Sequence, residues 1–264
     1  MGVLKKWYIF VEDPRLRKVW KQLRLKLAES FSFFRVLLRA RLFRCIDYCG
    51  VIFKFYVRNR NFARIDLAIR GEYWLNSPFT ISKRYLQLKV EPDVYQYGET
   101  PLLTIEKIAK QIHTTEQDCI FELGCGTGRC AFWLAYFTKC RIVGIEQIPD
   151  FVDFSNQLVE KDSFLEGKIN FIRNDFLSTD LNPATIIYCY GTKLTNAQIE
   201  ALILNLGKTQ PGTIVITVSY SLNEIISTSE NQAVLDKYFP IISKFDAEFF
   251  WGKTTVFIQK VPSI

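Results

Sequence analysis

Hydrophobic positions along the second half of the chain follow two alternating spacings. Short continuous apolar runs, as at 119–123, are typical of buried strands, and several segments between them repeat apolar residues at helical spacing. The pattern predicts strands at 119–123, 141–145, 169–173, 185–190, 213–219, 241–249 and 253–260, and helices at 101–112, 129–137, 149–161, 196–206 and 233–238. Strands that alternate with helices favour an α/β fold with a seven-stranded, mostly parallel sheet. The turn at Trp251–Gly252 predicts an antiparallel hairpin at one edge of this sheet.

The first 60 residues carry a different pattern, in which apolar stripes are mixed with arginine and lysine. Asp13–Pro14 is typical of a helix start, and a helical stripe follows it, made by Leu16, Val19, Trp20, Leu23 and Leu27. A second helix is predicted from Phe31 to about Val57. Residues 1–60 contain 15 Lys and Arg against 4 Asp and Glu, a net charge of +11, whereas the whole chain has +7, so the remainder has −4. We interpret 1–60 as a basic amphipathic helical extension, 61–96 as a connecting segment that packs on the core, and 97–264 as the main domain.

Two interpretations of this extension stay open. Arg35, Arg39, Arg41 and Arg44 lie close together, and each would be costly in the middle of a bilayer, so a membrane-spanning helix is not expected. The apolar stripes either dock on the main domain or lie on a membrane surface. The basic side chains could also bind nucleic-acid phosphates. The chain start lacks the continuous apolar segment of a secretory signal, so we expect a cytoplasmic protein, with peripheral membrane contact through 1–60 as a further possibility.

The cysteine and histidine content argues against a metal site. The chain has seven cysteines, at 45, 49, 119, 125, 130, 140 and 189, without a Cys-x-x-Cys pair, and its single histidine is His113. Most of these cysteines lie in apolar runs. The pattern predicts buried free thiols in a reducing compartment and no bound metal.

The segment Phe121–Arg129, FELGCGTGR, places three glycines between a predicted strand and a predicted helix. A dinucleotide fingerprint needs the third glycine one position later, where Arg129 stands, and a P-loop needs a Gly-Lys-Ser/Thr sequence that does not follow. Glu122 directly precedes the glycines, and a carboxylate there would repel a phosphate. The turn therefore indicates a ligand with a cationic ammonium group.

These residues resemble motif I of the class I S-adenosylmethionine-dependent methyltransferases, and the likeness extends from about Tyr97 to Lys260. The resemblance implies a Rossmann-like fold and S-adenosylmethionine as the cofactor. It implies that Glu146, at the end of the second strand and followed by Gln147, accepts hydrogen bonds from the ribose hydroxyls. Asp175 would lie near the adenine, with Phe176 against the base. The turn would approach the methionine part of the cofactor through Glu122, Gly124, Cys125, Gly126 and Gly128.

A finer resemblance lies upstream, in Tyr97–Gly98–Glu99–Thr100. This loop is similar to the Tyr-Gly-Glu-Thr loop of the non-SET histone-lysine methyltransferases of the disruptor-of-telomeric-silencing type. The resemblance implies that Tyr97, Glu99 and Thr100 lie at the methionine end of the cofactor, and that Arg129 stands where that family has a cofactor-contacting glutamine. That family also carries an Asn-Asn pair after the fourth strand, whereas this chain has Tyr190–Gly191, which leaves the acceptor open. The same position lacks the Asn-Pro-Pro-Tyr type of signature used on nucleobases.

Three functions are compatible with these patterns. The first is a methyltransferase that acts on a protein amine, such as lysine. The second is a methyltransferase for a small molecule, lipid or quinone at a membrane surface. The third is a non-catalytic cofactor-binding scaffold. Tyr190, at the end of the fourth predicted strand, is the candidate catalytic residue that faces the acceptor, with Thr192 and Tyr97 as weaker candidates.

Overall fold

The computed structural model describes residues 41–89 and 97–262. Contacts within the chain divide it into two units, Met1–Tyr48 and Cys49–Ile264. The helix predicted after Asp13 and the first part of the second predicted helix lie outside the described residues. Residues 41–51 are helical, and the π-helix η1 (Ile52–Tyr56) follows directly. Within the described residues, no helix has both the length and the apolar character that crossing a membrane requires.

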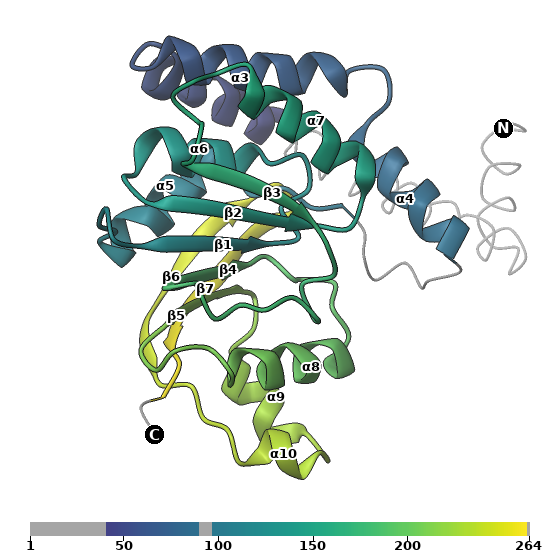
Figure 1. Ribbon diagram of the computed structural model, residues 1–264, viewed down its shortest axis with the longest axis vertical. Helices are drawn as coiled ribbons and strands as arrows, with labels where there is room; N and C mark the ends of the chain where they lie inside the picture. The colour runs from purple at the N-terminus through teal and green to yellow at the C-terminus, as the bar shows by residue number, and fades with distance from the viewer. Residues whose placement is uncertain (1–40, 90–96, 263–264) are drawn as a thin grey trace, which may run out of the picture. The chain divides into compact units, whose positions relative to one another are not determined.

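The second unit is built on a seven-stranded sheet in the order β3-β2-β1-β4-β5-β7-β6 (Figure 1). Five strands run parallel to one another: β1 (Cys119–Leu123), β2 (Arg141–Glu146), β3 (Ile169–Arg173), β4 (Ile186–Cys189) and β5 (Ile214–Val218). The hairpin of β6 (Ile241–Phe249) and β7 (Gly252–Lys260) adds the antiparallel pairs β5–β7 and β7–β6. The predicted α/β class, with its mostly parallel sheet and closing hairpin, is confirmed.

Helices cover both faces of the sheet. One face carries α3 (Arg60–Glu72), α5 (Leu102–Ile112), α6 (Arg129–Phe137) and α7 (Pro149–Glu160), and the other carries α8 (Asn196–Leu206), α9 (Leu222–Thr228) and α10 (Gln232–Leu235) (Figure 1). The helix α4 (Pro78–Lys89) follows α3. The pattern did not predict α3, α4 or α9 as separate helices. The short α9 begins with a capping box of Ser221 and Glu224, which is the sequence signal that could have located it.

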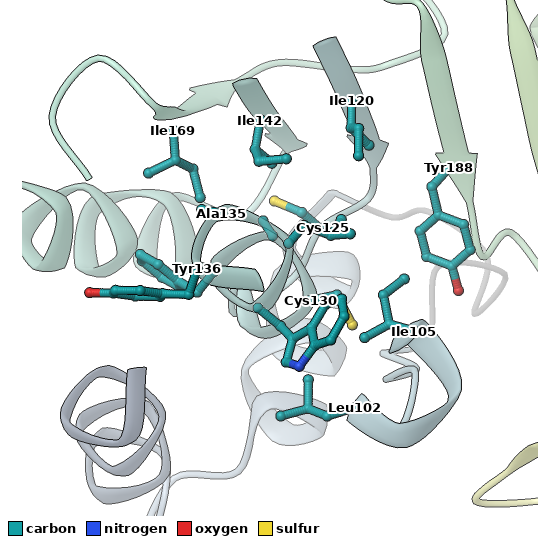
Figure 2. Close-up of a cluster of buried hydrophobic side chains, with 14 of the residues drawn as sticks. Leu102, Ile105, Ile120, Cys125, Cys130, Ala135, Tyr136, Ile142, Ile169 and Tyr188 are labelled. Carbon is teal, nitrogen blue, oxygen red and sulfur yellow. The ribbon is translucent and has the colours of Figure 1, made fainter. Parts of the chain in front are cut away.

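The two faces hold two separate hydrophobic clusters because successive strand residues point to opposite sides of the sheet. Ile120, Ile142 and Ile169 are neighbours in register on β1, β2 and β3. Figure 2 shows these three side chains directed toward α6, with Ala135 among the facing residues. Eight of the nine residues of α6 are buried, so this helix is covered on nearly its whole circumference.

The segment before α3 supplies part of that cover. Phe55 of η1 is 1% exposed, and its ring lies 5.4 Å from Trp133 and 5.2 Å from Phe137, measured between ring centroids. Phe62 of α3 also lies 5.2 Å from Phe137. The compact unit begins at Cys49 and includes η1, which inserts Phe55 into the core. The basic extension predicted at 1–60 stays a prediction.

Replacing Phe55 tests whether η1 is part of the cooperative core. We expect Phe55→Ala to lower the free energy of unfolding by about 3–5 kcal/mol, because it removes a buried ring and leaves a cavity beside α6. Phe53, in the same π-helix, is 76% exposed, so Phe53→Ala is the matched control and should change stability by about 0.5 kcal/mol or less. Chemical denaturation of both variants measures the difference. Equal effects would contradict the packing role of Phe55.

Candidate functional site

A cleft opens at the carboxyl ends of the parallel strands. Its walls come from the turn after β1, the end of β2, the segments after β3 and β4, the helix α4 and the loop at 97–98. The chain leaves β1 and β4, which are neighbours in the sheet, toward opposite faces. Ligands of open α/β sheets bind at such a switch point. The lining residues are Ser82, Tyr85, Leu86, Tyr97, Gly98, Leu123, Gly124, Gly126, Glu146, Gln147, Ile148, Phe151, Phe176, Cys189, Tyr190, Gly191, Thr192, Lys193 and Leu194.

The glycine turn forms the floor of the cleft beside β1. Gly124 has φ +70°, and a Cβ placed there would meet only the Phe176 ring, at 3.8 Å, so the backbone is open on its cleft side. Gly126 has φ +55°, and a Cβ there would lie 2.7 Å from the Tyr97 ring. Glycine is thus required twice for the left-handed backbone, and at Gly126 also for the close approach of Tyr97.

Glu146 is held in one orientation by the backbone. Its Oε1 accepts the N–H groups of Gln147 (2.7 Å) and Ile148 (2.9 Å), and its Oε2 accepts that of Gly126 (2.9 Å). Burial raises the pKa of Glu146, and these three donors oppose the rise. Because a carboxylate oxygen has two lone pairs, Oε2 can accept a further hydrogen bond from a ligand in the cleft. The carboxylate is a fixed acceptor at the cleft wall.

The loop Tyr97–Thr100 contacts a different part of the site with each of its four residues. The Tyr97 hydroxyl lies 3.1 Å from the Thr127 hydroxyl, and a Cβ on Gly98 would lie 2.5 Å from the Tyr190 ring. Glu99 accepts a hydrogen bond from Arg129 (Nη1–Oε1, 2.6 Å), and the hydroxyls of Thr100 and Tyr188 are 2.6 Å apart. Tyr97 and Gly98 line the cleft, whereas Glu99 and Thr100 do not, and these two residues tie the loop to Arg129 and Tyr188.

Glu122 is a buried carboxyl close to the cleft. Its oxygens receive the backbone N–H of Ala131, but Oε2 has no hydrogen-bond partner among the described residues. Burial raises the pKa of Glu122 to about 8, and repulsion from Glu146 and Glu99 adds to the rise. Such mutual repulsion requires the three carboxyl groups to lie near one another. An orphaned buried oxygen within this negative potential suits a cationic ligand.

Several residues predicted for the site do not line the cleft. The Asp175 carboxylate accepts the N–H of Leu177 (2.9 Å) and so caps the turn after β3, while its neighbour Phe176 does line the cleft. Cys125 points into the core, as Figure 2 shows, and Gly128 is the N-cap of α6. The roles of these residues in cofactor binding stay predictions.

Arg129 has a different setting from the one that the resemblance implies. It is 5% exposed and ion-paired to Asp66 of α3 as well as to Glu99, and it does not line the cleft. Asp66 was not predicted as part of the site. It lies 63 residues upstream of Arg129 in a segment without a motif, so no sequence signal marks it.

Tyr190 lines the cleft within a small aromatic cluster that the closing hairpin completes. Its hydroxyl oxygen accepts the indole N–H of Trp251 (2.6 Å), and its ring lies 5.7 Å from that of Phe249, which stacks on Trp251. Burial raises the pKa of Tyr190, and donation from Trp251 and Thr192 opposes the rise. Trp251 was predicted only as a turn residue, because its approach to Tyr190 depends on how the hairpin folds back.

The pKa of Glu122 gives a test of its buried setting. The pKa is 4.5 in the unfolded chain and about 8 in the folded protein, so folding binds a proton between these values and stability is lost as pH rises through them. We expect Glu122→Gln to remove this loss. Its free energy of unfolding should match that of the wild type near pH 4.5 and should exceed it by roughly 3–5 kcal/mol at about pH 9.

Denaturant unfolding across this pH range measures the difference. The control is Glu116→Gln, since Glu116 is an exposed carboxylate whose side chain is 70% accessible. Its pH profile should run parallel to that of the wild type above about pH 6, where an exposed Glu is already ionised. Parallel profiles for Glu122→Gln would contradict a raised pKa at Glu122.

Comparisons with known proteins agree on the kind of domain. Residues 122–229 match a family model described as the ANTKMT methyltransferase domain. The chain is similar to a sterol 24-C-methyltransferase of Kluyveromyces lactis, with 29% identity over 80 residues that cover 30% of this chain and 21% of that enzyme. It is also similar to a protein-lysine N-methyltransferase of Saccharolobus islandicus, with 26% identity over 128 residues, 48% of this chain and 77% of that enzyme. The chain therefore spans about a fifth of the sterol enzyme's length.

Among solved structures, the chain is similar to an RNA methyltransferase from Salinibacter ruber in complex with S-adenosyl-L-homocysteine, with a TM-score of 0.49 and 21% identity over 63% of this chain and 95% of that one. The family match begins at Glu122 and includes the glycine turn, Glu146 and Phe176. These are residues that form or border the cleft at the ends of β1, β2 and β3. The chain carries a class I S-adenosylmethionine-dependent methyltransferase domain.

Proposed function

We propose that the protein transfers a methyl group from S-adenosylmethionine to the side-chain amine of a lysine in a protein. The observation that carries the proposal is the likeness to a protein-lysine N-methyltransferase over 128 residues and 77% of that enzyme's length. The likeness to the sterol enzyme covers only 80 residues and 21% of its length. A match over most of a relative includes more than a shared cofactor motif, so it says more about the acceptor.

The residues around the cleft fit this cofactor. Glu146 presents a fixed carboxylate to the ribose hydroxyls, and the open backbone at Gly124 leaves room for the methionine part. Phe176, beside Gly124, offers an apolar surface to the base. The Glu99 carboxylate adds negative potential near the cleft, and an ammonium group bound there would favour ionisation of Glu122, whose pKa burial raises to about 8. When bound, S-adenosylmethionine supplies a methyl group on a sulfonium, which is a good leaving group.

The chain's own contribution is to orient the acceptor and to keep water away. Tyr190 is fixed by Trp251 at its hydroxyl, by Phe249 at its ring and by the close backbone of Gly98. Holding reacting groups in line is the main rate contribution available to a displacement of this kind. The aromatic face of Tyr190 suits the apolar stem of a lysine, and it attracts the ammonium form of the lysine on approach. The described residues next to Tyr190 include no histidine that could serve as a base.

A membrane-borne acceptor is the second candidate. The sterol methyltransferase relative favours it, and so do large apolar side chains on and before α4, the helix that forms one wall of the cleft. Leu75 is 94% exposed and Trp74 82% exposed, and Leu88 is also largely exposed. A lipid or quinone acceptor could reach the cleft from such a surface. A cofactor-binding scaffold without turnover is the third candidate.

Transfer of labelled methyl groups distinguishes these functions. The full chain is incubated with methyl-labelled S-adenosylmethionine and a lysate of the source cell, followed by protease digestion, organic extraction and acid hydrolysis. We expect label that is protease-sensitive and that elutes as methylated lysine after hydrolysis. Label in the organic phase would overturn the lysine proposal in favour of a lipid acceptor. Cofactor binding without transfer would favour the scaffold. Glu146→Ala serves as the background control.

Trp251 provides a prediction about the acceptor side alone. We expect Trp251→Ala to lower kcat/KM for the acceptor about tenfold, because Tyr190 loses the N–H donor that holds its hydroxyl and Phe249 loses the ring stacked on it. Trp251→Phe keeps the ring but not the donor and should fall between the wild type and Trp251→Ala. The dissociation constant of the cofactor should stay within about twofold of the wild type.

The matched control is Tyr238→Ala, since Tyr238 is 63% exposed and does not line the cleft. Methyl-transfer kinetics at varied acceptor concentration, together with calorimetry of cofactor binding, measure both effects. A loss of cofactor affinity equal to the loss in kcat/KM would contradict an acceptor-side role for Trp251.

A further inference from the structure

A buried ion cluster joins three separate segments behind the cleft. Asp66 of α3 is fully buried, and its Oδ1 and Oδ2 accept hydrogen bonds from Nε and Nη2 of Arg129, the latter at 3.2 Å. Arg70 (Nε, 3.1 Å) and the Tyr56 hydroxyl also donate to Asp66. The remaining arm of Arg129, Nη1, donates to Glu99 in the loop at the cleft. One guanidinium is thus shared between two carboxylates.

The two carboxylates, Asp66 and Glu99, differ in the hydrogen bonds that they accept and in their exposure. Both oxygens of Asp66 accept hydrogen bonds inside the core, whereas among the described residues Glu99 accepts through Oε1 alone, and its side chain is 24% exposed. Burial opposes ionisation of Asp66, but Arg129 keeps the pKa of that carboxyl below its usual range. Burial likewise opposes the charge on Arg129, and Glu99 with Asp66 holds its pKa well above the ordinary value. Both groups of the buried pair are therefore charged.

The charge balance decides what Glu99 can do. The single negative charge of Asp66 cancels the single positive charge of the Arg129 guanidinium. Arg70 adds a second positive charge, which is more exposed and therefore better screened by solvent. Glu99 therefore keeps most of its own negative charge while Arg129 fixes its position. The carboxyl groups of Glu99 and Glu122 lie close enough to interact, since repulsion from Glu99 helps to raise the pKa of Glu122. Tyr97 and Gly98, which precede it, line the cleft.

We propose that Asp66 is a positioning residue for the cofactor. By neutralising Arg129, it leaves the charge of Glu99 available to the ammonium group at the amino-acid end of S-adenosylmethionine. A helix that carries no cofactor motif thereby sets the affinity of the site. The inference rests on the proposed cofactor binding and is independent of the acceptor. If the charge of Asp66 is removed, only Glu99 remains of the two carboxylates that pair with Arg129, and the guanidinium then offsets the negative charge of Glu99.

Two ligands separate this charge effect from a general loss of structure. S-adenosylhomocysteine carries the ammonium, whereas 5′-methylthioadenosine keeps the adenosine and the thioether but lacks the whole amino-acid end. For Asp66→Asn we expect the dissociation constant of S-adenosylhomocysteine to rise about tenfold, equivalent to about 1.4 kcal/mol. That of 5′-methylthioadenosine should change by about twofold or less. Isothermal calorimetry on the full chain measures both constants, and thermal melting without ligand reports folding.

Further variants make the outcome decisive. In the double variant Asp66→Asn/Arg129→Gln the guanidinium is absent, so no positive charge offsets that of Glu99. The preference for S-adenosylhomocysteine over 5′-methylthioadenosine should then return to within about threefold of the wild type. Asp162→Asn is the matched control, because Asp162 accepts the Tyr136 hydroxyl as Asp66 accepts that of Tyr56. It should alter neither constant. Should Asp66→Asn not fold, Glu99→Gln must show the same selective loss.

Equal weakening of both ligands in Asp66→Asn, or in Glu99→Gln if it replaces that variant, would overturn the inference and leave the cluster a purely structural role. An unchanged preference in Glu99→Gln would overturn it as well. If the wild-type chain binds neither ligand, the proposed function itself fails, and the inference fails with it.

Discussion

The burial of α6 is the constraint on which much of this structure depends. Its sequence, RCAFWLAYF, is apolar on every side, so the helix needs cover around its whole circumference. The sheet supplies one side through Ile120, Ile142 and Ile169, and η1 with α3 supplies part of the other through Phe55 and Phe62. The same helix begins at the glycine turn. The packing that buries α6 therefore also fixes the position of the glycine turn.

The first residue of α6 brings a charge into this apolar setting. A buried guanidinium is costly unless its donors are all matched, and Arg129 meets the requirement with Asp66 on one side and Glu99 on the other. The arrangement links the helices before the domain to the loop at the cleft. It also leaves three carboxyl groups near one another, Glu146 in the cleft lining and Glu99 and Glu122 close to it, and their mutual repulsion would be relieved by a cationic ligand or by protonation.

In the proposed function, acceptor recognition draws on different elements from cofactor binding. The cofactor would contact the turns after β1, β2 and β3, whereas the acceptor would meet Tyr190, which follows β4 and is held by Trp251 of the β6–β7 hairpin. The wall formed by α4 contains no part of the motifs. The enzymes to which the chain is similar include a sterol 24-C-methyltransferase and a protein-lysine N-methyltransferase, which act on different acceptors.

The sequence alone determined the fold class, the order of the strands along the chain and the glycine turn, because these depend on periodicity and local backbone conformation. The first predicted strand, 119–123, coincides with β1. The sequence also placed Tyr97, Glu146, Phe176 and Tyr190 among the candidate residues, and all four line the cleft. Only the tertiary structure turned Arg129 away from the cleft toward Asp66, and only it brought Trp251 to Tyr190, 61 residues away. Both contacts join distant segments, and the burial that makes them favourable exists only once the chain has folded.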